Sequence, residues 1–259
     1  MSNRNAGKKK LVISLISNIH YVKLGFRSLL LLAALATYIT DKLWNTGRFL
    51  DIGSRHSYVF LIIWAIFVIE IALRFFPSSL ESMGCQKQFA RNFKKREESI
   101  PQPIVHKPYS EIAVAGITLL AAAIVGVLYY TKVIDQELVF IICLLFSVVD
   151  MVCILFFCPF QEWVMKNRCC VTCPIYNWDY PMMFLPLVFI KNFYTWSLLA
   201  LSLLLVIKWE IIKHRHPERF LEQHNCSLSC ENCKEKLCHH KKSLKRFLRT
   251  LRFHIKNDK

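Results

Sequence analysis

The sequence predicts an all-α, polytopic integral membrane protein with four to five transmembrane helices, a short cysteine-rich loop and a cysteine-rich, basic C-terminal tail. Three observations predict this fold class. Hydrophobic residues make up 54% of the chain and gather in long runs, the runs show almost no polar residues at helical spacing, and most of the 11 cysteines fall in two clusters beside the runs. A soluble helix would carry a polar face, so the runs are predicted to be membrane helices.

Five segments meet or approach the roughly 20 apolar residues that a helix needs to cross the bilayer core. They are residues 25–40, 57–76, 112–130, 137–157 and 193–212. The first is slightly short, and its Arg27 is long enough to reach the headgroups. We expect no cleavable signal peptide, because Lys23 and Arg27 precede any small-residue cleavage site. Together the segments define a transmembrane helical domain, residues 24–213, of a multi-pass protein of the cell membrane.

Two polar regions flank this domain: a basic N-terminal lead (residues 1–23) and a cytoplasmic-type tail (residues 214–259). Within the tail, residues 243–256 have the pattern of a basic amphipathic helix, suited to an anionic membrane surface or to packing against another subunit. The net charge of +16 lies in the polar segments, so the lipid bilayer with its anionic headgroups is the expected partner. A membrane protein partner or a homo-oligomer is a further possibility. Nucleic acid is not expected, because most aromatic residues lie in or beside the spans.

The two cysteine clusters are the main chemical signal. The loop over residues 158–180 and the tail segment 226–240 hold the predicted metal ligands: Cys158, Cys169, Cys170 and Cys173 in the loop, and Cys226, Cys230, Cys233, Cys238 and His239 in the tail. Thiolates and imidazoles at short spacing bind zinc, and thiolates hold iron–sulfur clusters. Zinc or an iron–sulfur cluster is therefore the predicted cofactor, and disulfides are the alternative in an oxidising compartment.

The two clusters differ in their spacing. The tail cluster is compact and predicts a knuckle stabilised by a metal ion or by disulfides. The loop cluster is looser: Cys170 and Cys173 form a C-x2-C pair of redox or ligand type, with Cys169 adjacent and Cys158 well upstream. Five complete crossings would put the clusters on opposite membrane faces. They share one face if residues 181–212 form a hairpin that turns at Lys191 and Asn192, and we favour this hairpin because it gathers the cysteines in one reducing compartment.

Four ionisable residues form a predicted intramembrane charge cluster. These are Arg27, Glu70, Arg74 and Asp150. A charge in the hydrocarbon costs about 2.5 to 3.5 kcal/mol, and alternating helices would bring all four to one depth beneath the cysteine-rich loop. Glu70 and Arg74 can pair as i,i+4 neighbours. Asp150 either pairs with an arginine to hold helices together or belongs to a proton or ion path.

These features favour a membrane protein that binds metal or an iron–sulfur cluster through its cysteine-rich segments, with electron transfer or thiol redox as its work. One alternative is a small transporter or channel that uses the intramembrane charges, with cysteines as structural staples. Another is a membrane assembly or scaffold protein with structural zinc. The sequence contains no nucleotide-binding loop and no nucleophile–base pair, so it leaves open whether the chain is an enzyme.

Overall fold

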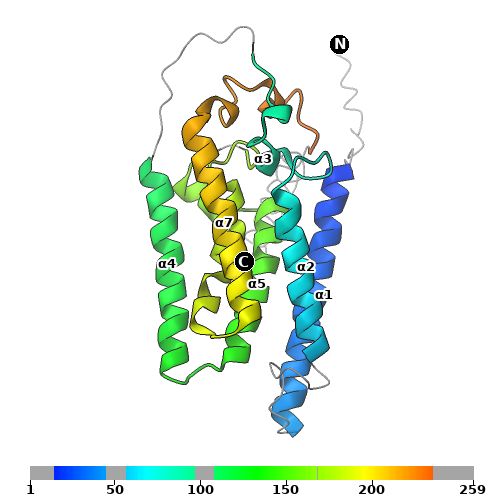
Figure 1. Ribbon diagram of the computed structural model, residues 1–259, viewed down its shortest axis with the longest axis vertical. Coiled ribbons are helices and arrows are strands. Elements are labelled where there is room, and N and C mark those ends of the chain that lie inside the picture. Colours follow the sequence, from blue (N-terminus) through cyan, green and yellow to red (C-terminus); the bar gives the residue numbers. More distant parts are fainter. Residues whose placement is uncertain (1–14, 45–56, 97–107, 168, 236–259) are drawn as a thin grey trace, which may run out of the picture.

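The computed structural model describes residues 15–44, 57–96, 108–167 and 169–235. Their fold is all-helical, as predicted, and an isolated antiparallel bridge joins Lys95 to Asn225 (Figure 1). Five long helices form the body of the molecule: α1 (Leu15–Trp44), α2 (Ser57–Arg74), α4 (Pro108–Tyr130), α5 (Gln136–Leu155) and α7 (Phe193–Arg215). Short helical segments connect them: α3 (Met83–Gln86), η1 (Ala90–Asn92), η2 (Phe160–Val164), η3 (Tyr176–Trp178), α6 (Asp179–Phe184), η4 (Leu185–Phe189), η5 (Pro217–Arg219) and η6 (Cys226–Leu228).

Each predicted span overlaps one of the five long helices. Among the described residues, α1, α4, α5 and α7 are long and apolar enough to cross a membrane, judged by length and composition. The helix α2 has 18 residues and carries Glu70 and Arg74 near its end. The first helix begins at Leu15 rather than at residue 25, so part of the predicted N-terminal lead is helical. Its early residues Ser17 and His20 are buried, which explains why the helix extends beyond its apolar stretch.

The helix ends follow local chemistry. The helix α2 stops at Arg74, shortly before Pro77, which lacks an amide donor and restricts the residue before it. At the start of α7, the Asn192 side chain accepts a hydrogen bond from the Tyr194 amide at 3.0 Å, the arrangement of an N-cap. Lys213 and Arg215 lie in the last turn of α7, where positive charge is favoured by the helix dipole.

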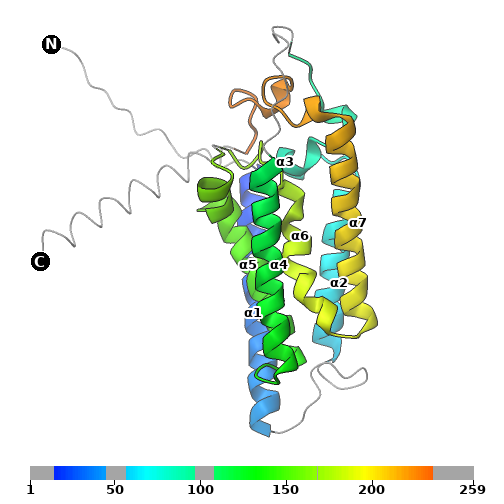
Figure 2. The ribbon, with the colours of Figure 1, turned by 90° about the vertical axis from the view of Figure 1, so that its left-hand side faces the viewer.

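From α1 to α5, successive long helices run in opposite directions (Figures 1 and 2). The helices α5 and α7 run in the same direction, because α6 and η4 lie between them in the chain. There α6 and η4 run from the end of α5 back along the body, and the chain turns at Ile190 to Asn192 before α7 returns. Pro186 lies in the first turn of η4, and its missing amide donor explains why this segment is broken rather than one continuous helix. Residues 179–215 therefore form a helical hairpin, as the sequence analysis favoured.

Because of this hairpin, three connecting segments meet at one end of the bundle, and we call the described residues of 75–96, 156–178 and 216–235 the cap (Figure 1). Hydrogen bonds join the three: the Cys226 amide donates to Lys94 O at 2.8 Å, and Lys87 Nζ donates to Cys173 O at 2.7 Å. The Ser17 hydroxyl at the start of α1 donates to Glu235 O at 2.6 Å. The described parts of both cysteine clusters thus lie in the cap, at the same end of the molecule.

The bundle core is packed through aromatic and aliphatic side chains. The rings of Phe60 and Phe140 lie 4.9 Å apart, and those of Phe67 and Phe184 lie 5.1 Å apart. The helices α4 and η4 approach closely at Gly126, where an added Cβ would lie 2.4 Å from the Phe189 ring. A side chain at this position would displace the Phe189 ring, so the glycine lets this ring pack directly against α4.

This contact predicts opposite outcomes for two alanine substitutions in the same helix. Gly116, unlike Gly126, has no heavy atom within 4 Å of an added Cβ, and both positions gain the same helix propensity from alanine. We expect Gly126→Ala to be less stable than Gly116→Ala by about 1 to 3 kcal/mol, the usual cost of overpacking. Unfolding of the two variants in detergent micelles measures the difference, and equal stabilities would show that α4 and η4 do not touch as described.

Candidate functional site

A buried guanidinium joins three helices near the cap. The Arg27 side chain of α1 is 1% exposed; its Nη2 lies 2.7 Å from Glu70 Oε2 on α2, and its Nη1 lies 3.3 Å from Asp150 Oδ2 on α5. It also donates to the carbonyl of Ser147 at 3.1 Å. The ring of Phe67 lies 5.5 Å from the guanidinium carbon, within the range of a cation–π contact. Arg27 thus satisfies two carboxylates from two other helices.

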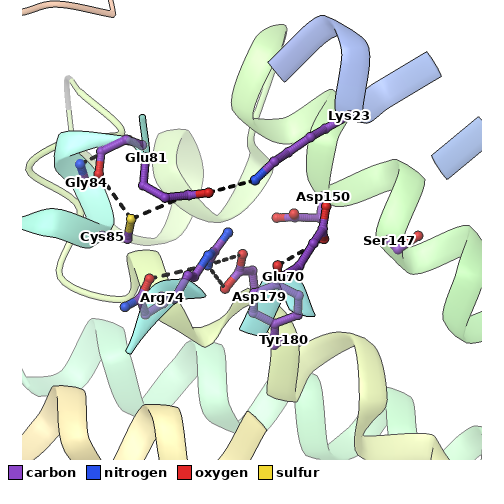
Figure 3. Close-up of polar contacts among 12 residues, drawn as sticks. Lys23, Glu70, Arg74, Glu81, Gly84, Cys85, Ser147, Asp150, Asp179 and Tyr180 are labelled. Carbon is purple, nitrogen blue, oxygen red and sulfur yellow. Dashed lines mark hydrogen bonds and ion pairs between the residues drawn. The ribbon is translucent and has the colours of Figure 1, made fainter. Parts of the chain in front are cut away.

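Arg74 takes a different partner from the one its sequence spacing suggested. Its Nη1 lies 2.8 and 2.6 Å from the two carboxylate oxygens of Asp179. The Arg74 guanidinium also lies over the ring of Tyr180. The hydroxyl of Tyr180 donates a hydrogen bond to Glu70 at 3.1 Å (Figure 3). Asp179 was not among the predicted site residues. Glu70 and Arg74 therefore do not pair as i,i+4 neighbours. Instead, Glu70 pairs with Arg27 of α1, and Arg74 pairs with Asp179 of α6.

Arg27, Glu70, Arg74, Asp150 and Asp179 form one layer of charge beneath the cap, and Figure 3 shows the last four of them. Two guanidinium groups face three carboxylates, so the layer carries an excess of one negative charge when every group is ionised. In a buried site such an excess favours uptake of a proton or a cation. The layer therefore has the composition of a structural ion-pair network together with one group that is available for protonation.

The cysteine-rich loop folds back on itself above this layer. Gln161 lies in η2, where its amide donates to Cys158 Sγ at 3.4 Å and its side-chain oxygen accepts from Cys170 Sγ at 2.8 Å. The Cys173 amide donates to Cys170 O at 3.0 Å, which closes a β-turn over the C-x2-C pair. A β-turn keeps its first and last Cα atoms within about 7 Å, close to the separation that a disulfide spans.

The thiols and carboxylates border the same cavity, which has a volume of about 280 Å³. Its polar lining includes Asp150, Asp179, Gln161 and three cysteines of the loop: Cys158, Cys170 and Cys173. Aliphatic and aromatic side chains of α4, α5 and α6 make up most of the rest, and Met182 and Met183 add sulfur atoms. Cys169, also predicted as a ligand, does not line it. The fold therefore brings three of the four loop cysteines to one cavity with Asp150.

A buried lysine of another cap segment contacts the cysteine-rich loop, and it was not among the predicted site residues. Lys87 is 0% exposed, and its Nζ donates to Val171 O at 2.8 Å and to Cys173 O at 2.7 Å. Burial lowers the pKa of Lys87 to about 8. Its position in a charged, polar stretch suggested a solvated loop, and nothing local in the sequence distinguishes it from the neighbouring exposed Lys94.

Two other cap groups are buried away from the cavity. Burial raises the pKa of the Cys85 thiol to about 12, so this thiol stays protonated. Burial also raises the pKa of Glu235, whose carboxylate accepts from the Ser82 hydroxyl at 2.5 Å and from the Met83 amide at 2.8 Å. Glu235 thereby attaches the tail segment to α3, and Cys85 and Glu235 both stabilise the cap.

The tail cluster is described only in part. Cys226, Cys230 and Cys233 lie in the cap, and Cys230 is exposed. Cys238, His239 and the predicted amphipathic helix over 243–256 lie outside the described residues. In the ranges that the structure covers, no three His, Cys, Asp or Glu side chains are grouped to hold a metal ion, and no disulfide joins two described cysteines. With part of the tail outside this view, zinc or an iron–sulfur cluster stays a prediction.

Comparison with family models, curated proteins and solved structures found no match to this chain.

The buried charge layer predicts a large stability loss when its central cation is removed. Arg27→Met would leave Glu70 and Asp150 buried without a counter-ion, which typically costs about 3 to 5 kcal/mol. Lys42→Met is the matched control, because it removes a cation whose ion pair with Asp135 is exposed, with side chains 57% and 46% accessible; exposed pairs contribute little. Thermal unfolding in detergent should show a marked drop for Arg27→Met alone. Equal melting temperatures in the two variants would contradict a central role for Arg27.

Proposed function

We propose that this chain is a multi-pass protein of the cell membrane that performs thiol–disulfide exchange through Cys170 and Cys173, with the cap on the cytoplasmic side. The observation that carries the proposal is the β-turn of the C-x2-C pair at a cavity that also contains Cys158. This is the thiol redox form of the activity expected from the sequence.

Membrane insertion is supported by the outward faces of the long helices. Large apolar side chains are exposed along them, including Leu29 at 65%, Leu119 at 61% and Ile207 at 54%. Continuous apolar surface of this kind is rare on soluble monomers and common where a protein meets lipid or a partner. A bilayer would cover these faces, and the ends of the helices would then lie at its two surfaces.

The distribution of basic residues between the two ends of the bundle supports one orientation in the membrane. The cap carries exposed Arg91, Lys94 and Lys95, and the sequence that continues from it beyond Glu235 is rich in Lys and Arg. The opposite end has fewer basic residues, and Lys42 there is paired with Asp135. Cytoplasmic segments are enriched in Lys and Arg, so the cap is assigned to the cytoplasm. In that reducing compartment, stable disulfides are rare and a C-x2-C pair is typically catalytic, redox-sensing or metal-binding.

The proposed reaction transfers a disulfide from a partner protein or small molecule to Cys170 and Cys173 of this chain. A thiolate of the pair attacks one sulfur of a partner disulfide, which forms a mixed disulfide and releases one partner thiolate. The second cysteine then attacks the mixed disulfide, so that Cys170 and Cys173 become bonded and the second partner thiolate leaves. Two thiols of this chain are oxidised, one partner disulfide is reduced to two thiols, and the two protons lost on one side are taken up on the other.

The test is an equilibrium titration of the purified full-length protein in glutathione redox buffers, followed by alkylation and peptide mass spectrometry. We expect a reversible two-electron transition that links Cys170 to Cys173 and disappears in Cys170→Ser and Cys173→Ser. Cys143→Ala is the control, because this thiol is buried in α5 and does not line the cavity.

Two results would overturn the exchange proposal. One is that Cys170 and Cys173 never join to each other at any glutathione ratio. The other is that elemental analysis of the same preparation finds stoichiometric zinc or iron protecting these thiols from alkylation, which would favour the metal-binding hypothesis instead.

A second candidate function, proton or ion transport, is favoured by the excess carboxylate of the charge layer. Asp150 and Asp179 both line the cavity, and Asp150 shares Arg27 with Glu70. A protonatable group at such a position is a typical element of a proton path. This function would give the cavity a conducting role and leave the cysteines as structural residues.

Transport is tested with the protein in liposomes that contain a pH-sensitive dye and carry an imposed potential. We expect Asp150→Asn to reduce proton flux by about a hundredfold, the usual contribution of a positioned proton-transfer group, while the protein still folds. Asp135→Asn is the control, since Asp135 is exposed at the opposite end of the bundle. Absence of flux in the wild-type protein, or equal flux in Asp150→Asn, would exclude a proton path through Asp150.

A further inference from the structure

The cavity beneath the cysteine-rich loop separates the first part of α4 from the second part of α5. Ile117 and Ala121 line it from α4, and Val149 lines it from α5. Farther from the cap, the ring of Phe189 in η4 packs against α4 at Gly126. The cavity therefore lies between α4 and α5, on the cap side of the contact between α4 and η4.

The mouth of the cavity lies between these two helices. The cavity is partly open to the outside, and of the residues that line it only Ile117 and Val149 are exposed, at 45% and 46%. Both residues belong to helices that are long and apolar enough to cross a membrane. In a bilayer this mouth opens toward the hydrocarbon, so a ligand reaches the cavity from the lipid.

The walls of the cavity favour an apolar chain, because most of the lining is aliphatic, aromatic or sulfur-containing. A hydrated ion or a sugar would lose its hydration on the way in, which is costly, whereas a hydrocarbon chain would not. The volume of about 280 Å³ is near the lower end of the range of about 300 to 1,000 Å³ for small-molecule sites. A single chain therefore fits these walls better than the two chains of a phospholipid.

Asp150 supplies the polar end of the cavity. Its Oδ2 lies 3.3 Å from Arg27 Nη1, a longer contact than the 2.7 Å between Arg27 Nη2 and Glu70. Among the described residues, no hydrogen bond reaches the other oxygen of this carboxylate, Oδ1. Asp179 also lines the cavity, but both of its oxygens contact Arg74. Asp150 is therefore the carboxylate that keeps an acceptor for a ligand.

The charge layer sets the sign of that ligand. Its three carboxylates outnumber its two guanidinium groups, so one added positive charge would balance it. A buried charge is stable when it has both a counter-ion and hydrogen bonds. A primary ammonium group provides both to a carboxylate, because it carries a positive charge and hydrogen-bond donors but no acceptor.

We propose that this cavity binds a single-chain amphiphile that carries a protonated primary amine. The ammonium group pairs with Asp150, and the apolar chain lies between α4 and α5 and leaves through the mouth at Ile117 and Val149. The inference goes beyond the proposed thiol–disulfide exchange, because binding of the amine requires no reaction of Cys170 or Cys173. It therefore stands or falls separately from the glutathione titration.

The test is photolabelling of the full-length protein in phosphatidylcholine nanodiscs. The probes are dodecylamine and dodecanol, each with a diazirine in its chain, and peptide mass spectrometry locates the labels. We expect saturable labelling of α4 and α5 by the amine, with half-saturation at a mole fraction in the bilayer about tenfold lower than for the alcohol. The reason is that hydrogen bonds to charged groups are stronger than those between neutral groups. Equal half-saturation by the two probes would overturn the inference.

A first pair of variants tests the charge. Asp150→Asn removes the charge and keeps the size of the side chain, so the amine should lose its advantage over the alcohol. Asp135→Asn is the control and should keep that advantage, because Asp135 is exposed at the opposite end of the bundle. A folded Asp150→Asn variant that still prefers the amine contradicts the pairing with Asp150.

A second pair tests the cavity without changing the charge layer, and it decides the question if Asp150→Asn does not fold. Ala121→Leu narrows the cavity, so saturable labelling by both probes should weaken. Ala123→Leu makes the same substitution at an exposed residue of α4 that does not line the cavity, and its labelling should match the wild type. Equal labelling of these two variants would place the amine on the outer surface of the helices and overturn the inference.

Discussion

The guanidinium of Arg27 contacts α2 through Glu70 and α5 through Asp150 and the Ser147 carbonyl, all from one side chain on α1. Helices that meet through apolar side chains alone can slide or rotate at small cost, since many apolar packings are nearly equal in energy. A buried cation with two carboxylates does not allow this, because any displacement leaves a charge without a partner. The relative register of α1, α2 and α5 is therefore set at this residue.

The second constraint is the hairpin of α6, η4 and α7. Asp179 begins α6 and pairs with Arg74, so the hairpin is anchored to the end of α2 at the level of the charge layer. Because α6 and η4 run back along the body, α7 runs in the direction opposite to them. Residues 216–235, which follow α7, therefore lie at the same end as the cysteine-rich loop. The three segments of the cap meet because the chain turns back at Asn192. Within the cap, Lys87 joins residues 75–96 to the cysteine-rich loop through the carbonyls of Val171 and Cys173.

The chemistry of the cavity depends on both constraints together. The charge layer supplies Asp150 and Asp179 on one side, and the loop held by Gln161 and Lys87 supplies thiols on the other. This arrangement places an ionisable layer beside a C-x2-C turn in an otherwise apolar surrounding, where electrostatic interactions are stronger than in water. Thiol exchange and proton uptake both depend on such electrostatic interactions, so the same site supports both candidate functions.

The sequence by itself determined the five long helices, because each is a run of apolar residues near bilayer length, and an α-helix satisfies the backbone hydrogen bonds of such a run within one segment. It also determined that Arg27, Glu70 and Asp150 required partners, since their cost in an apolar segment is a local property. Which partners they found was decided by tertiary structure: Arg74 pairs with Asp179 instead of Glu70, and Lys87 is buried although it belongs to a polar, charged stretch of the sequence. These outcomes depend on distances between segments far apart in the chain, and local spacing carries no information about such distances.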